Sequence, residues 1–352
     1  MLFSKPALDA IEALTPSQVD FLKVLPKAEL HAHLNGSIPL PVLQQLAKEY
    51  VPSGTDSDST LLVIKSGIEK LQDGVTFDEI HDFFNLFPAI YALTSTKEAL
   101  ARVASAVLAE FLGLKEEEEC PQATYLELRS TPRKTIAMTR LEYVETVLDE
   151  VEKYRPDQAV LIVSLDRRMS KEVADECVEA AISLKKRGRR IVGVDLCGDP
   201  TAGDMEHFTS HFVAVKAAGL GITLHVAETT ENSPEDTLKL LSFKPDRLGH
   251  ATFLNDEAQG VVIRERMAIE ICLTSNLLCK TVSDLETHHI RYYLKKNHPV
   301  AICTDDILPF RTNLLGEYAM LLAPAPCGLG LSEDEVERIA AMGHGSRFRI
   351  NT

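Results

Sequence analysis

The chain has 352 residues, of which 45% are hydrophobic and 25% are charged, as in globular proteins with a large core. Its 37 Lys and Arg against 52 Asp and Glu give a formal net charge of -15, so a nucleic acid polymer is excluded as an expected partner. A single nucleotide remains compatible with this charge, because one phosphate needs only a local group of donors.

The N-terminal residues 1–24 alternate charged and apolar positions at helical spacing. They predict a helical extension and not a signal peptide. No run of about 18 apolar residues follows, so we expect no membrane segment and a cytosolic protein. The seven cysteines are scattered and never spaced as C-x-x-C, which argues against a disulfide scaffold or a cysteine-ligated zinc.

Eight short apolar runs rich in β-branched residues recur along the chain, separated by stretches of helical period. They span residues 27–33, 124–130, 159–165, 190–196, 221–227, 246–251, 268–274 and 299–305. Eight strands alternating with helices predict an α/β fold, the (β/α)₈ TIM barrel, whose active site lies at the C-terminal ends of the strands. We expect residues 1–352 to form a single domain.

The interval from residue 37 to 123 is too long for a simple connection between the first two strands. Helical patterns occur in it at residues 39–50, 77–93 and 96–113. They predict a helical insertion that caps the C-terminal face of the barrel. Residues 51–60 are expected to form a loop, and the acidic run at 115–120 a solvated helix end.

Two histidines end the first predicted strand. His31 and His33 are two residues apart, so on a strand both side chains would point to the same face, toward the barrel mouth. Taken alone, such a pair is better explained by ordinary polar residues at a strand end than by metal ligation. The other strand ends therefore decide between the two interpretations.

Further potential ligands end three other strands. His225 ends the fifth, His250 the sixth, and Asp305 with Asp306 the eighth, where a barrel places its catalytic groups. Three histidines and one carboxylate suit Zn²⁺ and leave a position for water, whose pKa at such a site falls to about 7. The structural alternatives are a backbone-bonded core histidine for His250 and a helix cap for one of the two aspartates.

Glu228 follows His225 by three residues, so on a continuing strand it would point away from that histidine. It can share the site only if the chain turns after Val226 or Ala227. An acid near the metal could then give a proton to a purine ring nitrogen. The alternative is a loop carboxylate that caps the following helix.

The segments LPKAELHAHLNGSI, DLCGDP, HVAE, DRLGHATFL, CLTSN and ICTDD occur in this order from Leu25 onward. In this order they resemble the motifs of the adenosine deaminase family of metal-dependent hydrolases. The resemblance implies one zinc ion per chain, held by His31, His33, His225 and Asp305. It also implies that Glu228 donates a proton to the purine N1 and that His250 orients the attacking hydroxide.

The same resemblance implies how the purine is held. Asp306 would accept a hydrogen bond from N7 or its neighbourhood, and the Gly198 backbone would meet N3 where a side chain would clash. Attack at C6 would then expel ammonia or an amine. The full set that would line the substrate is His33, Asn35, Tyr91, Ser130, Thr131, Pro132, Arg133, Asp166, Gly198 and Asp306.

One departure from adenosine deaminases proper concerns the ribose 5′ end. Their first motif reads H-x-H-L-D-G, whereas this chain has Asn35 at the aspartate position. A carboxylate there would repel a 5′-phosphate and an amide can donate to it. Ser130, Thr131 and Arg133 add hydroxyls and a guanidinium at the end of the second strand, unless they form only a charged surface turn.

LELRSTPR and LDRR, together with HAHLNGSI, resemble the adenosine deaminase-like branch, the N6-methyl-AMP deaminases. The leading hypothesis is therefore an aminohydrolase, most simply a monomer, that converts N6-methyl-AMP to IMP and methylamine. The first alternative is an adenosine deaminase that acts on free adenosine or deoxyadenosine. The second is a catalytically inactive barrel that acts as a binding protein.

Overall fold

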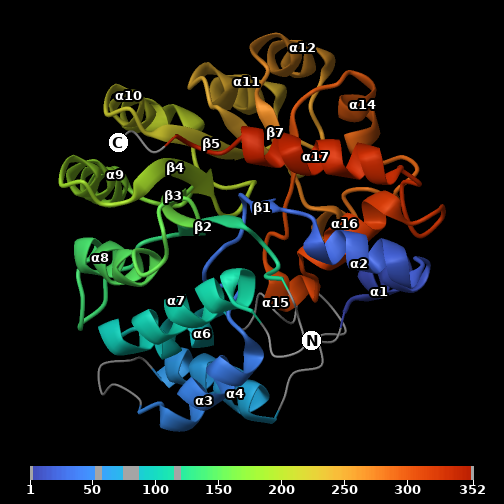
Figure 1. Ribbon diagram of the computed structural model, residues 1–352. Coiled ribbons are helices and arrows are strands. Elements are labelled where there is room, and N and C mark those ends of the chain that lie inside the picture. The colour runs from blue at the N-terminus through green and yellow to red at the C-terminus, as the bar shows by residue number, and fades with distance from the viewer. Residues whose placement is uncertain (1–2, 52–57, 74–86, 115–119, 350–352) are drawn as a thin grey trace.

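The computed structural model describes residues 3–51, 58–73, 87–114 and 120–349. Its centre is a sheet of eight parallel strands in which each strand pairs with the next along the chain (Figure 1). The strands are β1 (Ala28–Glu29), β2 (Tyr125–Ser130), β3 (Ala159–Asp166), β4 (Ile191–Cys197), β5 (Gly221–Val226), β6 (Arg247–His250), β7 (Ala268–Ile271) and β8 (Val300–Ile302). The His33 N–H donates to the Asp305 carbonyl at 3.4 Å, which joins the last strand to the first. The predicted (β/α)₈ barrel is confirmed.

The first and last strands are much shorter than predicted, for a reason visible in one side chain. The buried Glu29 carboxylate accepts hydrogen bonds from the backbone N–H groups of His31, at 2.7 Å, and Thr304, at 2.9 Å. These donors are therefore satisfied by a side chain and not by a neighbouring strand. The ladder is therefore interrupted after Glu29, and pairing with β2 resumes at His33, which bridges to Arg129.

Helices surround the sheet on its outer side (Figure 1). Those that follow the strands are α8 (Arg140–Val151), α9 (Lys171–Lys186), α10 (Thr209–Ala217), α11 (Pro234–Ser242), α12 (Asp256–Glu265), α13 (Leu273–Leu278), α14 (Ile290–Lys295), α15 (Ile307–Phe310), α16 (Leu314–Leu322) and α17 (Glu333–Gly345), with a short 3₁₀ turn at Met205–Phe208. Capping boxes at Thr139 and Ser332 fix the starts of α8 and α17. No helix in the described ranges is long and apolar enough to cross a membrane.

The predicted N-terminal extension forms two helices, α1 (Lys5–Glu12) and α2 (Pro16–Val24). Both pack against α16, and they lie beside it in Figure 1. Ala7 on α1 is fully buried, and a Cβ added at Gly316 of α16 would lie 3.0 Å from its methyl group. The glycine therefore allows the two helices to approach closely.

The insertion between β1 and β2 contains α3 (Leu40–Glu49), α4 (Asp58–Asp73), α6 (Phe87–Leu93) and α7 (Lys97–Leu112). Helix α4 was not predicted, and its first residues, 58–60, were expected to form a loop. Three predicted stretches lie outside the described residues: residues 52–57 of that loop, residues 77–86 of the second predicted helix and residues 115–119 of the acidic run. The side chain of Tyr91 on α6 lines the cavity at the barrel mouth. That the whole insertion caps this face stays a prediction.

The barrel interior is charged and not only apolar. Arg247 donates to Glu270 at 2.7 Å and to Glu127 at 2.6 Å, and Arg129 donates to Glu270 at 2.7 Å. All four side chains are at most 1% exposed. Charges this deep are tolerated only when they are paired, so the network holds the strands in one register.

The C-terminal end of the described chain closes the barrel floor. The Phe348 ring lies 3.7 Å from the Arg247 guanidinium, and its backbone N–H donates to Glu127 at 2.7 Å. Side chains at Gly193 and Gly221 would collide with this ring. The opposite end of the barrel is left to carry the cavity.

Candidate active site

A cavity of about 780 Å³ opens at the C-terminal ends of the strands, which is a typical size for a small-molecule site. Most of the residues predicted from the sequence line it: His33, Asn35, Tyr91, Ser130, Thr131, Arg133, Asp166, Gly198, His225, Glu228, His250, Asp305 and Asp306. Pro132 is buried and is not part of the lining. His31 is also fully buried, next to the lining histidines.

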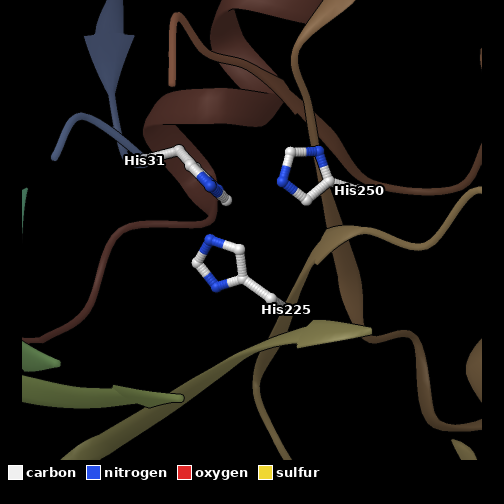
Figure 2. A group of neighbouring side chains, drawn as sticks. All are labelled: His31, His225 and His250. Carbon is white, nitrogen blue, oxygen red and sulfur yellow. The ribbon is translucent and has the colours of Figure 1, made fainter. Parts of the chain in front are cut away.

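His31 is held from one side so that its other nitrogen is free. Its Nδ1 lies 2.6 Å from Glu270, and its buried Nε2 has no hydrogen-bond partner. Burial, followed by the charge of Arg129, lowers the pKa of His31 well below its usual value. Figure 2 shows the rings of His31, His225 and His250 gathered around a common point. A neutral imidazole with a free Nε2 is the form that binds a metal ion.

His225 is oriented in the same way by a different carboxylate. Its Nδ1 lies 3.0 Å from Asp195, and its Nε2 lies 3.2 Å from the Nε2 of His33. Burial lowers the pKa of His225, but the Asp195 carboxylate outweighs burial and raises it to about 9. For His33, burial and the neighbouring His225 lower the pKa well below its usual value. Two ring nitrogens this close need a cation or proton between them.

Asp305 brings a carboxylate to the same place. Its Oδ1 lies 3.8 Å from the Nε2 of His31 and 3.7 Å from the Nε2 of His33, and its Oδ2 accepts from Ser275 at 2.9 Å. The residue has φ of 61°, so the backbone turns its side chain inward just after β8. The donor set of three imidazoles and one carboxylate fits a zinc ion.

Two other compact groups of potential ligands occur among the described residues: His31, His225 and His250, and His31, Cys272 and Asp305. Burial raises the pKa of Cys272 well above its usual value, which disfavours the thiolate form that binds a metal ion. The Nε2 of His250 lies 3.9 Å from both Glu228 and Asp305. The geometry is compatible with both histidine sets, and the predicted set with His33 leaves His250 beside the ligands.

Glu228 enters the cavity through the turn that the sequence required. Ala227 has φ of 51°, which bends the chain directly after β5. Helix α11 is capped by Ser233, so Glu228 is not its cap. One carboxylate oxygen of Glu228 faces His250 at 3.9 Å, and the other is buried without a partner. This unpartnered oxygen is placed to meet a polar atom of a ligand.

Asp306 begins α15, yet its side chain makes no capping hydrogen bond. Its Oδ1 is buried without a partner, and Gly36 packs so closely against the carboxyl group that any Cβ there would collide with it. Burial, then the charge of Asp305, raises the pKa of Asp306 well above its usual value. Burial therefore favours the protonated form of this carboxyl group, which can donate a hydrogen bond.

The residues predicted to lie near the ribose 5′ end of the substrate are on the β1 and β2 side of the cavity. Asn35 is 8% exposed and its Oδ1 has no partner. Arg133 donates to the Tyr91 carbonyl at 3.0 Å and to Thr94 at 2.6 Å, and its guanidinium lies 4.2 Å from the Tyr91 ring centre. Arg133 thus joins the end of β2 to the insertion and is not a free surface charge. Ser130 pairs with Tyr143 at 2.9 Å.

The loops after β3 and β4 meet at a glycine. Gly198 has φ of 97°, and a Cβ added to it would lie 2.8 Å from the Asp166 carboxyl carbon. Asp166 is itself held by two hydrogen bonds from Arg168, at 2.6 and 2.9 Å. A side chain at position 198 is therefore excluded by backbone conformation and by contact.

Sequence reasoning missed the residues that hold the predicted ligands. Glu270 and Asp195 orient His31 and His225, and the buried Arg167 donates to the His225 carbonyl at 2.7 Å. The sequence signal that could have revealed these residues is a charged side chain within an apolar strand. Asp195 lies in DLCGDP and Glu270 in AIEICLT, where an unpaired charge would be costly and a partner should have been sought.

The adenosine deaminase family model matches residues 26–348 of the chain. The chain belongs to the adenosine deaminase family. The N6-methyl-AMP deaminase of Danio rerio is 34% identical over 343 residues, which cover 93% of this chain and 92% of that protein. The apo N6-methyl-AMP deaminase of Arabidopsis thaliana matches with a TM-score of 0.80 at 32% identity over 95% of both chains. Arabidopsis ADAL complexed with IMP matches with a TM-score of 0.78 at 31% identity over 94% of both chains.

These similarities confirm the predicted family and its adenosine deaminase-like branch. The family is metal-dependent, and the histidine and aspartate cluster at the barrel mouth could hold a metal ion. The chain is a hydrolase that acts on a purine C–N bond, as predicted.

Proposed function

We propose that the chain is a zinc-dependent deaminase of N6-substituted purine nucleoside monophosphates, which converts N6-methyl-AMP to IMP and methylamine. The observation that carries this proposal is the pair of buried, unpartnered oxygens on Glu228 and Asp306, which line one cavity with Asn35 beside the histidine cluster. Relatives from zebrafish, human and Arabidopsis that are N6-methyl-AMP deaminases support it, as does the solved structure of Arabidopsis ADAL with IMP.

One zinc ion per chain would be held by His31, His33, His225 and Asp305. When bound, the metal supplies Lewis-acid activation of the attacking water. The chain contributes the orientation of its ligands: Glu270 fixes the Nδ1 side of His31, Asp195 that of His225, and Ser275 one oxygen of Asp305. Such supporting hydrogen bonds set which atom of each ligand faces the metal.

The remaining groups would act on the purine. Glu228 would give a proton to N1, which makes C6 more electrophilic, and His250 beside it would orient the attacking water. Asp306, in its protonated form, would donate to N7. This is opposite to the direction expected from the sequence, because N7 of a neutral purine carries no hydrogen. The Gly198 backbone would approach N3 where no side chain fits.

The phosphate would lie at the β1 and β2 side. Asn35 and the hydroxyls of Ser130 and Thr131 supply donors there, and Arg133 supplies a positive charge. Tyr91 and Asp166 would flank the ribose from the insertion and from β3. Pro132 would act only by shaping the turn, because it is not in the lining.

The test is a comparison of kcat/KM on N6-methyl-AMP, AMP and adenosine with the purified zinc-loaded protein, followed by ultraviolet absorbance. We expect N6-methyl-AMP to be the preferred substrate. Preference for adenosine would establish the free-nucleoside alternative and discard the 5′-phosphate assignment. Stoichiometric zinc without turnover of any of the three would indicate an inactive barrel that binds purines.

A further inference from the structure

One part of the cavity wall has no role in the chemistry above. Thr252 follows β6, and Asn276, Cys279 and Thr281 lie in and after α13, beyond β7; all four line the cavity. In a closed ring of eight strands in chain order, β6 faces β2 and β7 faces β3 across the barrel. This wall therefore lies opposite the side assigned to the phosphate.

The orientation of the purine follows from the positions of this wall and of the phosphate side across the cavity. With the phosphate near β2, the base extends across the mouth toward β6 and β7. The exocyclic N6 is bonded to C6, between N1 and N7, on the edge of the base farthest from the ribose. Under the proposed function N1 faces Glu228 and N7 faces Asp306, so a substituent on N6 points past His250 to the wall behind it.

The hydrogen bonds of this wall are satisfied internally. The Asn276 amide donates to Thr281 at 3.0 Å and to Thr252 at 3.4 Å, and its carbonyl pairs with the Nε2 of His288 at 3.1 Å. The Ile290 N–H donates to the Nδ1 of the same histidine, which leaves its proton on Nε2. The Thr281 hydroxyl is thus paired with Asn276 in both directions, and the Thr252 hydroxyl accepts from the same amide.

No charged side chain belongs to this part of the lining, and the buried His288 behind it is neutral because burial lowers its pKa to about 2. The lining here consists of two threonines, the Cys279 thiol and the Asn276 amide. Such a surface suits a small apolar group better than water or a charge.

We propose that Thr252, Asn276, Cys279 and Thr281 form the subsite for the N6 substituent and for the amine as it leaves, and that this subsite selects small alkyl groups. This inference rests on the proposed function. It identifies the residues by which the protein would distinguish N6-alkylated nucleotides from AMP. Thr281 is the residue to alter, because it is half-buried and its hydroxyl bond to Asn276 can be kept or removed by choice of variant.

The experiment compares kcat/KM on AMP, N6-methyl-AMP and N6-propyl-AMP for the zinc-loaded wild type, Thr281→Ile and Thr281→Ser. One methylene in such a pocket changes specificity by about tenfold or more. Thr281→Ile should therefore lower the ratio of N6-methyl-AMP to AMP by about tenfold, whereas Thr281→Ser should raise the ratio of N6-propyl-AMP to N6-methyl-AMP. Thr209→Ile on the outer helix α10 is the matched control and should change neither ratio.

Ratios within about twofold of the wild type in both Thr281 variants would overturn the subsite while leaving the proposed function in place. Thr281→Ser keeps the hydroxyl bond to Asn276. If Thr281→Ile does not fold, the ratio of N6-propyl-AMP to N6-methyl-AMP turnover in Thr281→Ser decides whether the subsite exists. A wild type that turns over none of the three nucleotides would overturn the proposed function itself, and the subsite with it.

Discussion

The Nδ1 of His31 lies 2.6 Å from a carboxylate oxygen of Glu270, and both side chains are fully buried. The same carboxyl group accepts from Arg129, Arg247 and Thr223. Glu270 therefore connects the charged interior of the barrel to the first histidine of the cavity. Burial raises the pKa of Glu270, but Arg129 and Arg247 outweigh it and lower the pKa to about 2, so the acceptor stays ionised.

Glu270→Gln is expected to weaken zinc binding by about 10- to 100-fold, because a neutral amide replaces the ionised acceptor that fixes the tautomer and direction of the His31 ring. Competition with a chromophoric chelator measures this affinity. Glu127→Gln is the matched control, since Glu127 pairs with Arg247 at the barrel floor and does not touch His31. Both variants should lose stability, because buried Arg247 then keeps only one of its two carboxylate partners. Equal zinc affinity in the two variants would contradict the role of Glu270.

A substitution at Gly249 tests the position of the same histidine ring through a direct steric contact. A Cβ at this position would lie 2.6 Å from the Cε1 of His31, whose ring cannot retreat because Glu270 holds it. Gly249→Ala should therefore lower zinc affinity by at least about tenfold.

Gly260→Ala provides the comparison, because Gly260 lies in α12 with open space around it. There the alanine should raise stability by about 1 kcal/mol and leave zinc binding unchanged. Zinc binding by Gly249→Ala that matches the wild type would show that the His31 ring has room to move.

The sequence predicted those site residues that lie at the C-terminal ends of strands. His225, His250 and Asp305 were placed by their position after apolar runs, and the turn at Ala227 was required by the spacing of Glu228. Such reasoning works because a parallel barrel brings all C-terminal strand ends to one face.

Pairings across the barrel could not be read in this way. Glu270 meets Arg129 and His31, which lie 141 and 239 residues earlier in the chain, and strand periodicity contains no information about which charge faces which. The length of β1 was also misjudged, because Glu29 replaces ladder hydrogen bonds with its own carboxylate. Helix α4 was missed because the polar residues 51–60 were assigned to a loop, although Ser, Thr and Asp among them also favour a helix start.

The pH dependence of stability should carry a contribution from Glu317. This carboxyl group on α16 accepts from the Leu273 N–H and the Thr312 hydroxyl, both at 2.8 Å, and burial raises its pKa to about 7 from 4.5. Between these two values the folded state holds more protons than the unfolded state. Stability should therefore fall as the pH rises through this window, by roughly 3 kcal/mol in all.

Glu317→Gln removes this titration. The free energy of unfolding of the variant, relative to the wild type, should therefore improve from pH 5 to pH 8. Urea denaturation of both proteins at several pH values measures the difference, in which contributions from other groups cancel. A difference that stays flat across this range would mean that Glu317 is ionised in the folded protein throughout.

Asn35 is the residue on which the nucleotide assignment depends most. Its Oδ1 is buried without a partner on the β1 side of the cavity. Asn35→Asp would place a carboxylate beside the 5′-phosphate, and repulsion at such a buried site should raise KM for N6-methyl-AMP by about tenfold or more. Asn35→Leu removes the amide without adding charge, so the comparison of the two variants isolates the repulsion. N6-methyladenosine, which has no phosphate, should respond alike to both changes. An equal rise in KM for nucleotide and nucleoside with Asn35→Asp would place the phosphate elsewhere in the cavity.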